Sequence, residues 1–123
     1  MKVVVTGGAG FIGANLSRTL LATDEVAEVL VLDDLSTGFL DNLEGLDVEF
    51  VEGTIIDPAT LDQCLTGATS VVHLAARPSV PRSVKDPVAS HLANATGTVN
   101  VLEAARLAGN IQVIVASSSS VYG

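Results

Sequence analysis

The chain of 123 residues is 48% hydrophobic, 16% charged and 3% aromatic, and six basic against fourteen acidic residues give a formal net charge of −8. This composition excludes a disordered chain, and no apolar run reaches the roughly 18 to 20 residues that span a bilayer. The acidic balance has the wrong sign for an electrostatic grip on nucleic acid, and the length predicts one compact domain over residues 1–123.

The chain begins with an apolar run, Lys2–Thr6, which is expected to be a strand. A signal peptide is not expected, because glycines and no long apolar stretch follow this run. The single cysteine, Cys64, has no partner for an internal disulfide and fits a reducing compartment, so the expected location is the cytoplasm. No His or basic residue flanks Cys64 to activate it, which favours a buried structural thiol.

Short runs rich in Val, Ile and Leu alternate along the chain with longer segments of helical period. Runs this uniformly apolar are typical of strands that are buried on both faces, as in a parallel sheet. The expected strands are Lys2–Thr6, Glu28–Asp33, Val48–Glu52, Ser70–Leu74 and Gln112–Ala116.

Three segments between these strands carry helix signals. Phe11–Ala22 has an apolar stripe at helical spacing, and Pro58–Leu65 begins with Asp57 as a plausible N-cap. Pro87–Leu107 is the longest expected helix, and Gly109 marks its end. The apolar residues that recur at helical spacing are Ile12, Leu16 and Leu20 in the first helix and Leu92, Ala95, Val99 and Leu102 in the last. The last helix also has apolar or small residues outside this stripe, at Val101, Ala104, Ala105 and Ala108.

The regular alternation of strand and helix predicts the α/β class. The expected architecture is a Rossmann-type, doubly wound parallel sheet of five strands with right-handed crossovers and the order 3-2-1-4-5. In such a sheet, ligands bind at the carboxyl ends of the strands where the order reverses, here between the first and fourth strands.

A glycine-rich loop lies between the first strand and the first helix. Gly7, Gly10 and Gly13 have the spacing GxxGxxG. Gly7 permits a tight turn, Gly10 lets the backbone approach a pyrophosphate, and Gly13 allows close packing of the helix. The helix N-terminus offers free N–H groups to the phosphates. This placement predicts dinucleotide binding, although glycines also serve in ordinary turns.

An aspartate, Asp33, ends the second strand 20 residues after Gly13. A carboxylate at this place accepts hydrogen bonds from an adenosine ribose and repels a 2′-phosphate, so NAD is favoured over NADP. The alternative is a solvated strand-end aspartate or a cap for the following turn.

Five ordered motifs together resemble the NAD-dependent epimerase/dehydratase family, the extended short-chain dehydrogenases/reductases, and within it the UDP-glucose 4-epimerase type most. They are TGGAGFIG, VLDDLSTG, HLAARPSVPRSVKDP, NATGTVNVLEAAR and ASSSSVYG, and they cover the whole chain. The resemblance implies that NAD is the cofactor and that a UDP-hexose is the substrate of the complete enzyme. It also implies a homodimer formed through the long helix; the alternative is that this helix is buried more completely within one subunit.

The resemblance also implies roles for individual residues. Thr54 stands where many relatives carry an adenine-contacting aspartate, and Ser118 matches the Ser/Thr of the catalytic triad. The implied cofactor-binding residues are Gly7, Gly10, Phe11, Ile12, Gly13, Asp33, Asp34, Thr37, Gly38, Thr54, Ile55, Leu74, Ala75, Ala76, Asn94, Ala116 and Ser117. No His, Cys or carboxylate cluster has the spacing of a metal site.

The implied reaction is 4-epimerisation through hydride transfer to NAD and a 4-keto sugar. Relatives use a YxxxK pair downstream of the VYG motif, whereas this chain ends at Gly123 and its only tyrosine, Tyr122, belongs to VYG. The chain is therefore expected to be the N-terminal part of a longer enzyme, to lack the last strands and the substrate domain, and to be inactive by itself.

Several alternatives stay open. A stand-alone NAD-binding regulatory module would show the same glycine loop, and a purely structural piece would not need Asp33. UDP-glucuronate 4-epimerisation or decarboxylation are the other candidate reactions, while Ser119 and Ser120 replace the Asp-Glu pair typical of sugar 4,6-dehydratases. His73 is expected to be a packed core residue. A basic group lies in solvent or near nucleotide-sugar phosphates; it consists of Arg77, Arg82 and Lys85.

Overall fold

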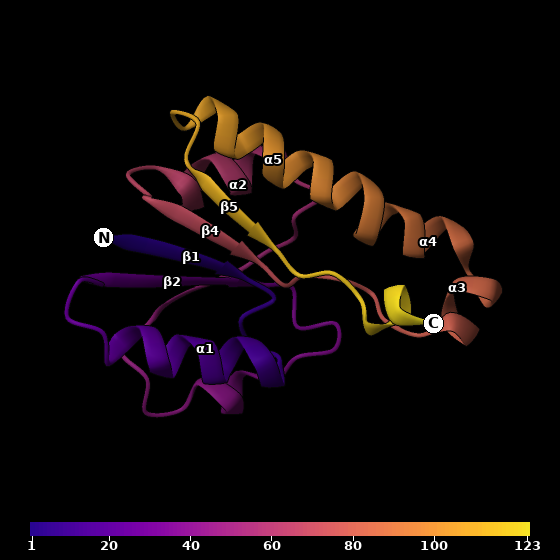
Figure 1. Cartoon of the computed structure of the whole chain (residues 1–123), viewed down its shortest axis with the longest axis horizontal. Helices are drawn as coiled ribbons and strands as arrows, with labels where there is room; N and C mark the ends of the chain where they lie inside the picture. The colour runs from indigo at the N-terminus through magenta and orange to yellow at the C-terminus, as the bar shows by residue number, and fades with distance from the viewer.

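The computed structural model, which describes residues 1–123, contains one sheet of five parallel strands in the order β3-β2-β1-β4-β5 (Figure 1). The predicted fold class and strand order are therefore confirmed. The strands are β1 (Lys2–Thr6), β2 (Glu28–Asp33), β3 (Glu49–Glu52), β4 (Ser70–His73) and β5 (Gln112–Val115). Three of them are one residue shorter than predicted: β3 starts one residue later, and β4 and β5 end one residue earlier.

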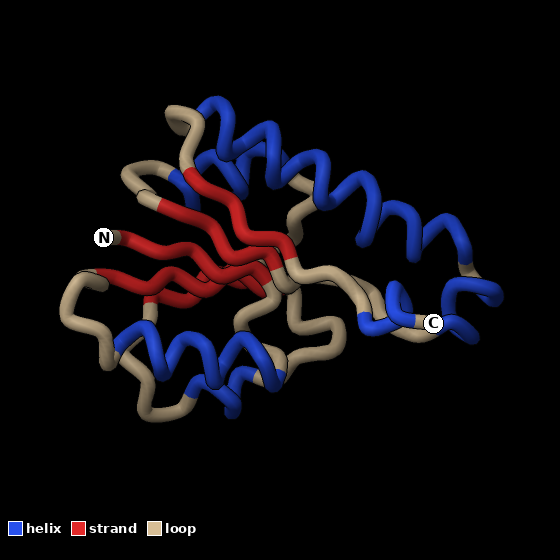
Figure 2. Tube along the Cα trace, viewed as in Figure 1, coloured by secondary structure: helices blue, strands red, loops and turns tan.

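Helices cover both faces of this sheet (Figure 2). The α-helix α1 (Phe11–Leu21) lies on one face, and α2 (Pro58–Leu65) and α5 (Gly97–Leu107) lie on the other. Asp57 caps α2 as predicted, because its carboxylate accepts a hydrogen bond from the Ala59 N–H at 3.1 Å. The remaining helical segments are η1 (Leu40–Leu43), α3 (Val80–Lys85), α4 (Pro87–His91), the π-helical turn η2 (Leu92–Thr96) and η3 (Ser119–Tyr122).

The apolar strands build one core on each face of the sheet. Val3 and Val5 of β1 pack toward α1, whereas Val4 between them packs toward α2 and α5. The same alternation holds in β2: Val29 and Val31 pack in the core beside α1, and Leu30 and Leu32 pack in the core beside α2 and α5. Period-two alternation therefore places apolar side chains in both layers, which explains why these runs carry no polar residue in their middle.

The helix α1 buries mainly small residues against the rest of the protein. Ile12 is 68% exposed, and the fully packed positions are Gly13, Ala14 and Ser17. The helix approaches the glycine loop so closely that only small side chains fit between them, whereas Leu16 and Leu20 pack at the border of the core. The stripe of large apolar residues therefore does not by itself mark the contact face of α1, which consists of small residues.

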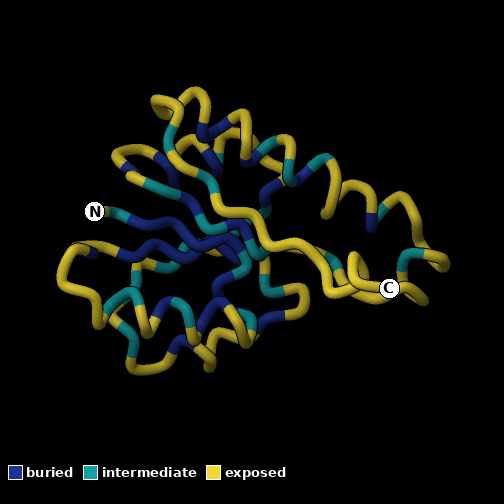
Figure 3. The backbone as a smooth tube through the Cα atoms, viewed as in Figure 1, coloured by how far each residue is buried: buried dark blue, intermediate teal, exposed yellow.

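The long helix forms over residues 87–107 with a π-helical turn inside it, and much of its length is exposed (Figure 3). Val99 is 62% exposed and Leu102 is 46% exposed, and Leu92 and Ala95 are exposed as well. The buried residues of α5 are Gly97 and three members of the second apolar face, Val101, Ala104 and Ala105. A Cβ on Gly97 would overlap the side chain of Ile55, so small residues again set the contact face.

Two further expectations concern single features. Cys64 is buried in the core beside α5, as predicted, and burial raises the pKa of its thiol above the usual value. No helix combines the length and the apolar character that a membrane crossing requires.

Candidate cofactor site

The turn after β1 brings the glycine loop against the second residue after β4, Ala75. Gly7 has φ of +71°, and a Cβ there would lie 2.7 Å from the Ala75 backbone nitrogen. Gly7 therefore needs to be glycine for its conformation and for its close approach to β4. The loop consequently sits between the carboxyl ends of β1 and β4, at the predicted switch point of the sheet.

The amino end of α1 offers unpaired donors beside this loop. Gly10 is the N-cap and makes no side-chain cap, and the backbone N–H groups of Phe11, Ile12 and Gly13 donate no hydrogen bond within the chain. A Cβ on Gly10 would meet only the Gly7 carbonyl oxygen, at 3.4 Å. Three free N–H groups and the positive end of the helix dipole form a site suited to a phosphate group.

Asp33, at the end of β2, is fastened to the glycine loop. Its carboxylate accepts one hydrogen bond from the Ala9 N–H at 2.9 Å and another from the Leu35 N–H at 2.8 Å, and the residue is 9% exposed. Each carboxylate oxygen keeps a lone pair, so the group can also accept from a ribose hydroxyl. Asp33 thus acts as the cap of the following turn and still retains acceptor capacity for a ligand.

Sequence reasoning missed Ala9, which fixes the loop from both sides. Its carbonyl oxygen accepts hydrogen bonds from the Phe39 N–H at 3.1 Å and from the Asn42 side-chain amide at 2.8 Å. A Cβ on Gly38 would lie 2.9 Å from the Ala9 backbone, so Gly38 permits this contact. Neither Ala9 nor Asn42 has a local sequence signal, because their partnership depends on a contact across about thirty residues of chain.

The other residues expected on the adenine side differ in what their side chains can reach. Asp34 is exposed and accepts a hydrogen bond from the Ser36 N–H at 2.9 Å, and Thr37 is exposed beside it. The Thr54 hydroxyl accepts from the Ile56 N–H at 3.1 Å. The Ile55 side chain lies in the core, and its carbonyl oxygen accepts a hydrogen bond from the Asn100 side-chain amide at 3.1 Å.

Leu74, Ala75 and Ala76 follow β4 and pass beside the glycine loop. The backbone N–H groups of Leu74 and Ala75 both lie 3.2 Å from the Thr6 hydroxyl oxygen. Asn94 lies in η2 and its side chain is occupied by Arg77: it accepts from the Arg77 N–H at 2.7 Å and donates to the Arg77 carbonyl at 3.1 Å. Asn94 therefore fixes the course of the β4 loop through its amide.

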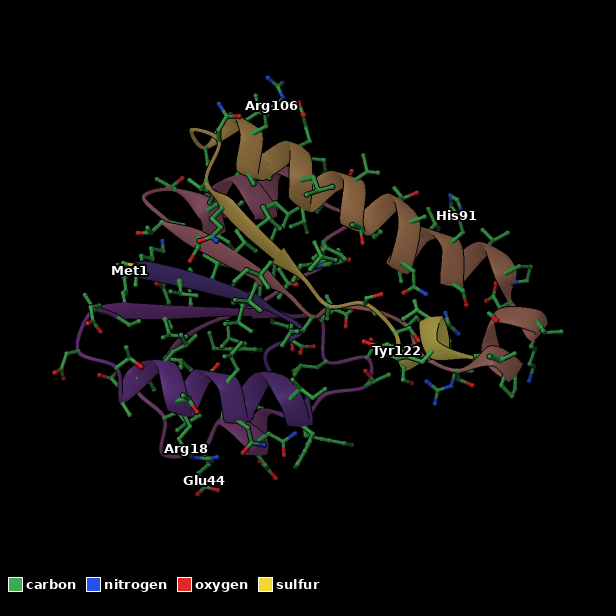
Figure 4. All side chains as sticks on the ribbon, in the orientation of Figure 1. Met1, Arg18, Glu44, His91, Arg106 and Tyr122 are labelled. Carbon is green, nitrogen blue, oxygen red and sulfur yellow. The ribbon has the colours of Figure 1, made fainter.

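Ala116, Ser117 and Ser118 follow β5 at the same edge of the sheet and are exposed. The Ala116 N–H donates to the His73 carbonyl at 3.2 Å, which prolongs the pairing of β5 with β4. The Ser118 hydroxyl accepts from the Ser120 N–H at 3.1 Å and so caps η3. Tyr122 is 90% exposed and projects from η3, outside the sheet (Figure 4).

The basic group predicted after β4 lines one open pocket together with Asp86. The only ion pair of the structure joins Arg106 and Glu103, on the outer face of α5, so Arg77, Arg82 and Lys85 form no salt bridge, and Asp86 is the one carboxylate that shares their pocket. Half of the six basic residues of an acidic chain are thus gathered, unpaired, at one place. No cluster of three or more His, Cys, Asp or Glu side chains that could hold a metal ion is present.

His73 is buried as expected, and burial lowers its pKa below the usual 6.5. The unfolded chain therefore binds a proton on this residue at a higher pH than the folded chain does. We expect the free energy of unfolding to fall as the pH drops below about 6.5, and the His73→Gln variant to lose part of this dependence. Urea unfolding measured between pH 8 and pH 5 checks this, with His91→Gln on the exposed face of α4 as the control; equal slopes for the two variants would contradict it.

Three comparisons with known proteins bear on this site. Residues 3–123 match the model of the NAD dependent epimerase/dehydratase family. The whole chain aligns at 44% identity with the UDP-glucose 4-epimerase of Mycolicibacterium smegmatis and covers 41% of that protein. It therefore spans about two fifths of the length of this relative.

Solved structures show the same fold. A UDP-glucose 4-epimerase of Thermotoga maritima with UDP-glucose is 34% identical over 96% of this chain and 38% of its own, with a TM-score of 0.88. The dTDP-glucose 4,6-dehydratase DesIV of Streptomyces venezuelae, crystallised with NAD, is 38% identical over 92% of this chain and 38% of its own, with a TM-score of 0.86. Both an epimerase and a dehydratase are therefore similar to this chain.

Proposed function

Because this chain belongs to the NAD dependent epimerase/dehydratase family, whose cofactor is NAD, we propose that it is the NAD-binding portion of a nucleotide-sugar 4-epimerase of the UDP-glucose/UDP-galactose type. The observation that carries the proposal is the hydrogen bond between the Asp33 carboxylate and the Ala9 N–H. This bond joins the candidate ribose acceptor to the candidate phosphate loop in one rigid unit at the switch point of the sheet.

The residues present fit a dinucleotide. The free N–H groups of Phe11, Ile12 and Gly13 would take the pyrophosphate, with Gly7 and Gly10 leaving room for it, and Asp33 would take the adenosine ribose. The adenine side would be bordered by Asp34, Thr37, Gly38, Thr54 and the Ile55 backbone, and the nicotinamide side by Leu74, Ala75, Ala76, Asn94, Ala116 and Ser117.

NAD supplies the chemistry of accepting a hydride from the sugar and returning it. The Ser118 hydroxyl would hydrogen-bond the sugar 4-oxygen, since its Oγ proton is not needed for the η3 cap. The unpaired Arg77, Arg82 and Lys85 would attract the phosphates of the nucleotide sugar. A base for the 4-hydroxyl proton is not supplied by a YxxxK pair among these 123 residues, so the chain is expected to bind NAD without turning over sugar.

The choice of an epimerase over a dehydratase rests on Ser119 and Ser120. Dehydration needs an acid and a base at the sugar, and sugar 4,6-dehydratases carry Asp-Glu at this position, whereas hydroxyl groups titrate outside the useful range. The neutral pair in this chain therefore supports epimerisation. The choice of the sugar and of its nucleotide depends on the residues that contact them.

Calorimetric titration of the chain with NAD, and with NADP beside it, tests the proposal. NAD is expected to bind more tightly, because the Asp33 carboxylate repels a 2′-phosphate and residues 28–57 contain no Arg or Lys to neutralise it. If neither dinucleotide binds, the proposal fails for this chain. If NAD binds but the complete protein that contains these residues does not convert UDP-glucose or UDP-galactose, the proposal of an enzyme is rejected in favour of a regulatory NAD-binding module.

The outward stripe of the long helix supports the homodimer that is part of this proposal. Val88, Leu92, Val99 and Leu102 are all at least 42% exposed and lie along one continuous helical segment. We expect Leu102→Asp to convert a dimer into a monomer, because a charge placed in an apolar contact loses its hydration. Sedimentation measurements check this, with Gln63→Asp on exposed α2 as the control; an unchanged dimer in Leu102→Asp would exclude this face.

A further inference from the structure

His73, at the end of β4, uses both ring nitrogens inside the protein. Its Nδ1 lies 2.7 Å from the Thr6 hydroxyl oxygen of β1, and its Nε2 lies 3.0 Å from the Thr98 hydroxyl oxygen of α5. The residue is 3% exposed, and Thr6 is its direct register partner in the sheet. One imidazole therefore connects β1, β4 and α5 immediately behind the candidate cofactor site.

The neighbouring acceptors and donors fix the direction of each hydrogen bond. The Thr98 hydroxyl lies 2.6 Å from the Asn94 carbonyl oxygen, which can only accept, so Thr98 donates to it and accepts from the His73 Nε2–H. The Thr6 hydroxyl already accepts from the N–H groups of Leu74 and Ala75, so its own proton goes to Nδ1. His73 is consequently the neutral Nε2–H tautomer.

The hydrogen-bonded chain Thr6–His73–Thr98–Asn94, called the relay below, holds both ends of the segment 74–77. Thr6 holds the N–H groups of Leu74 and Ala75, and Asn94, at the other end of the relay, holds both the N–H and the C=O of Arg77. Asn94 lies in the π-helical turn η2, a feature that often occurs at functional positions. The course of residues 74–77 thus depends on the relay at both ends.

We propose that His73 is a positioning residue for the cofactor: through Thr6 and Thr98 it keeps residues 74–77 in the course that NAD binding requires. The inference rests on the proposed function, which places this segment beside the nicotinamide half. His73 has no nitrogen left for a proton transfer with substrate or for a metal ion, so its action is through the segment that it holds.

Thr98→Val is the principal variant, because valine has nearly the shape of threonine and lacks the hydroxyl that accepts from the Nε2–H and donates to the Asn94 carbonyl. We expect its NAD dissociation constant to rise about tenfold, and that of Thr98→Ser to stay near the wild-type value because the hydroxyl is kept. His73→Gln and His73→Asn can each replace only one of the two ring nitrogens, so both are expected to weaken NAD binding. Amide hydrogen exchange at Leu74, Ala75 and Arg77 should accelerate in all three weakened variants.

Val101→Ala separates positioning from stability. Val101 is fully buried on the same helix and takes no part in the relay, so its truncation lowers the free energy of unfolding but is expected to leave the NAD affinity of the folded protein unchanged. An equal loss of NAD affinity in Val101→Ala and Thr98→Val, at matched stability, would overturn the proposal. Wild-type affinity in Thr98→Val would do the same.

The tautomer can be read without NAD. The chain contains two histidines, so nitrogen NMR of the labelled protein with His91→Gln leaves the His73 signals alone. We expect an Nε2–H imidazole at neutral pH; an Nδ1–H or a doubly protonated ring would overturn the relay. A wild-type chain that shows this tautomer and fails to bind NAD would instead overturn the proposed function, and with it the cofactor role of His73.

Discussion

Gly10→Val is expected to abolish NAD binding and to leave the fold intact. Gly10 has φ of −78°, which any residue adopts, and a Cβ there meets only the Gly7 carbonyl oxygen at 3.4 Å. The added isopropyl group projects at the amino end of α1, where the loop backbone has to approach the pyrophosphate. We expect the dissociation constant to rise by about 100-fold or more, which corresponds to about 2.7 kcal/mol.

Gly13→Val provides the matched contrast, because the same substitution three residues later should fail for another reason. A Cβ on Gly13 would overlap the Gly8 Cα and lie 2.6 Å from the Gly7 carbonyl oxygen, and the backbone cannot yield there. We expect a loss of about 3 kcal/mol in the free energy of unfolding for this variant. Urea unfolding and calorimetry on both variants test the pair. Normal NAD binding by Gly10→Val would show that the loop is not the phosphate site.

The strands and their order were predictable because the signals are local and strong. Each apolar run is uniform, and consecutive parallel strands with short crossovers leave few topologies to choose from. The packing faces of α1 and α5 depend on a close approach of backbones rather than on large apolar side chains. Their contact positions are Gly13, Ala14, Gly97 and Ala104, which carry little hydrophobic surface but allow the backbones to approach.

The candidate site likewise has a part that the sequence predicts and a part that it does not. The tight turn at Gly7 and the position of Asp33 at the end of β2 were predictable, because backbone conformation and strand-end position restrict the residue type there. The contacts that make the loop rigid were not, since Ala9, Asn42 and Thr98 have no distinctive local pattern. His73 was expected only as a packed core residue; its hydrogen bonds to two threonines depend on β1, β4 and α5 being assembled.

Asp33→Ala is expected to weaken NAD binding by about 1 to 3 kcal/mol, which is about 5- to 150-fold in the dissociation constant. Two losses contribute. The ribose loses a charged acceptor. The Ala9 N–H loses its hydrogen bond to Asp33 Oδ2, at 2.9 Å, which fixes the glycine loop to the end of β2 and is called the loop clamp below. Asp62→Ala on the exposed face of α2 changes the charge equally and should leave the affinity unchanged. Unchanged affinity in Asp33→Ala would reject the ribose assignment.

Asp33→Asn separates the two losses, because it keeps the shape and removes the charge. Both carboxylate oxygens accept backbone N–H groups, from Ala9 and from Leu35, so the asparagine amide can restore only one of these bonds. Amide exchange at Ala9 reports whether the clamp has opened, whereas the ratio of NADP to NAD affinity reports the lost repulsion of a 2′-phosphate. If Asp33 only fixes the loop through Ala9, Asp33→Asn would lower the affinities for NAD and for NADP equally. A rise in that ratio, with Ala9 still protected, is the result expected if the carboxylate faces the ribose.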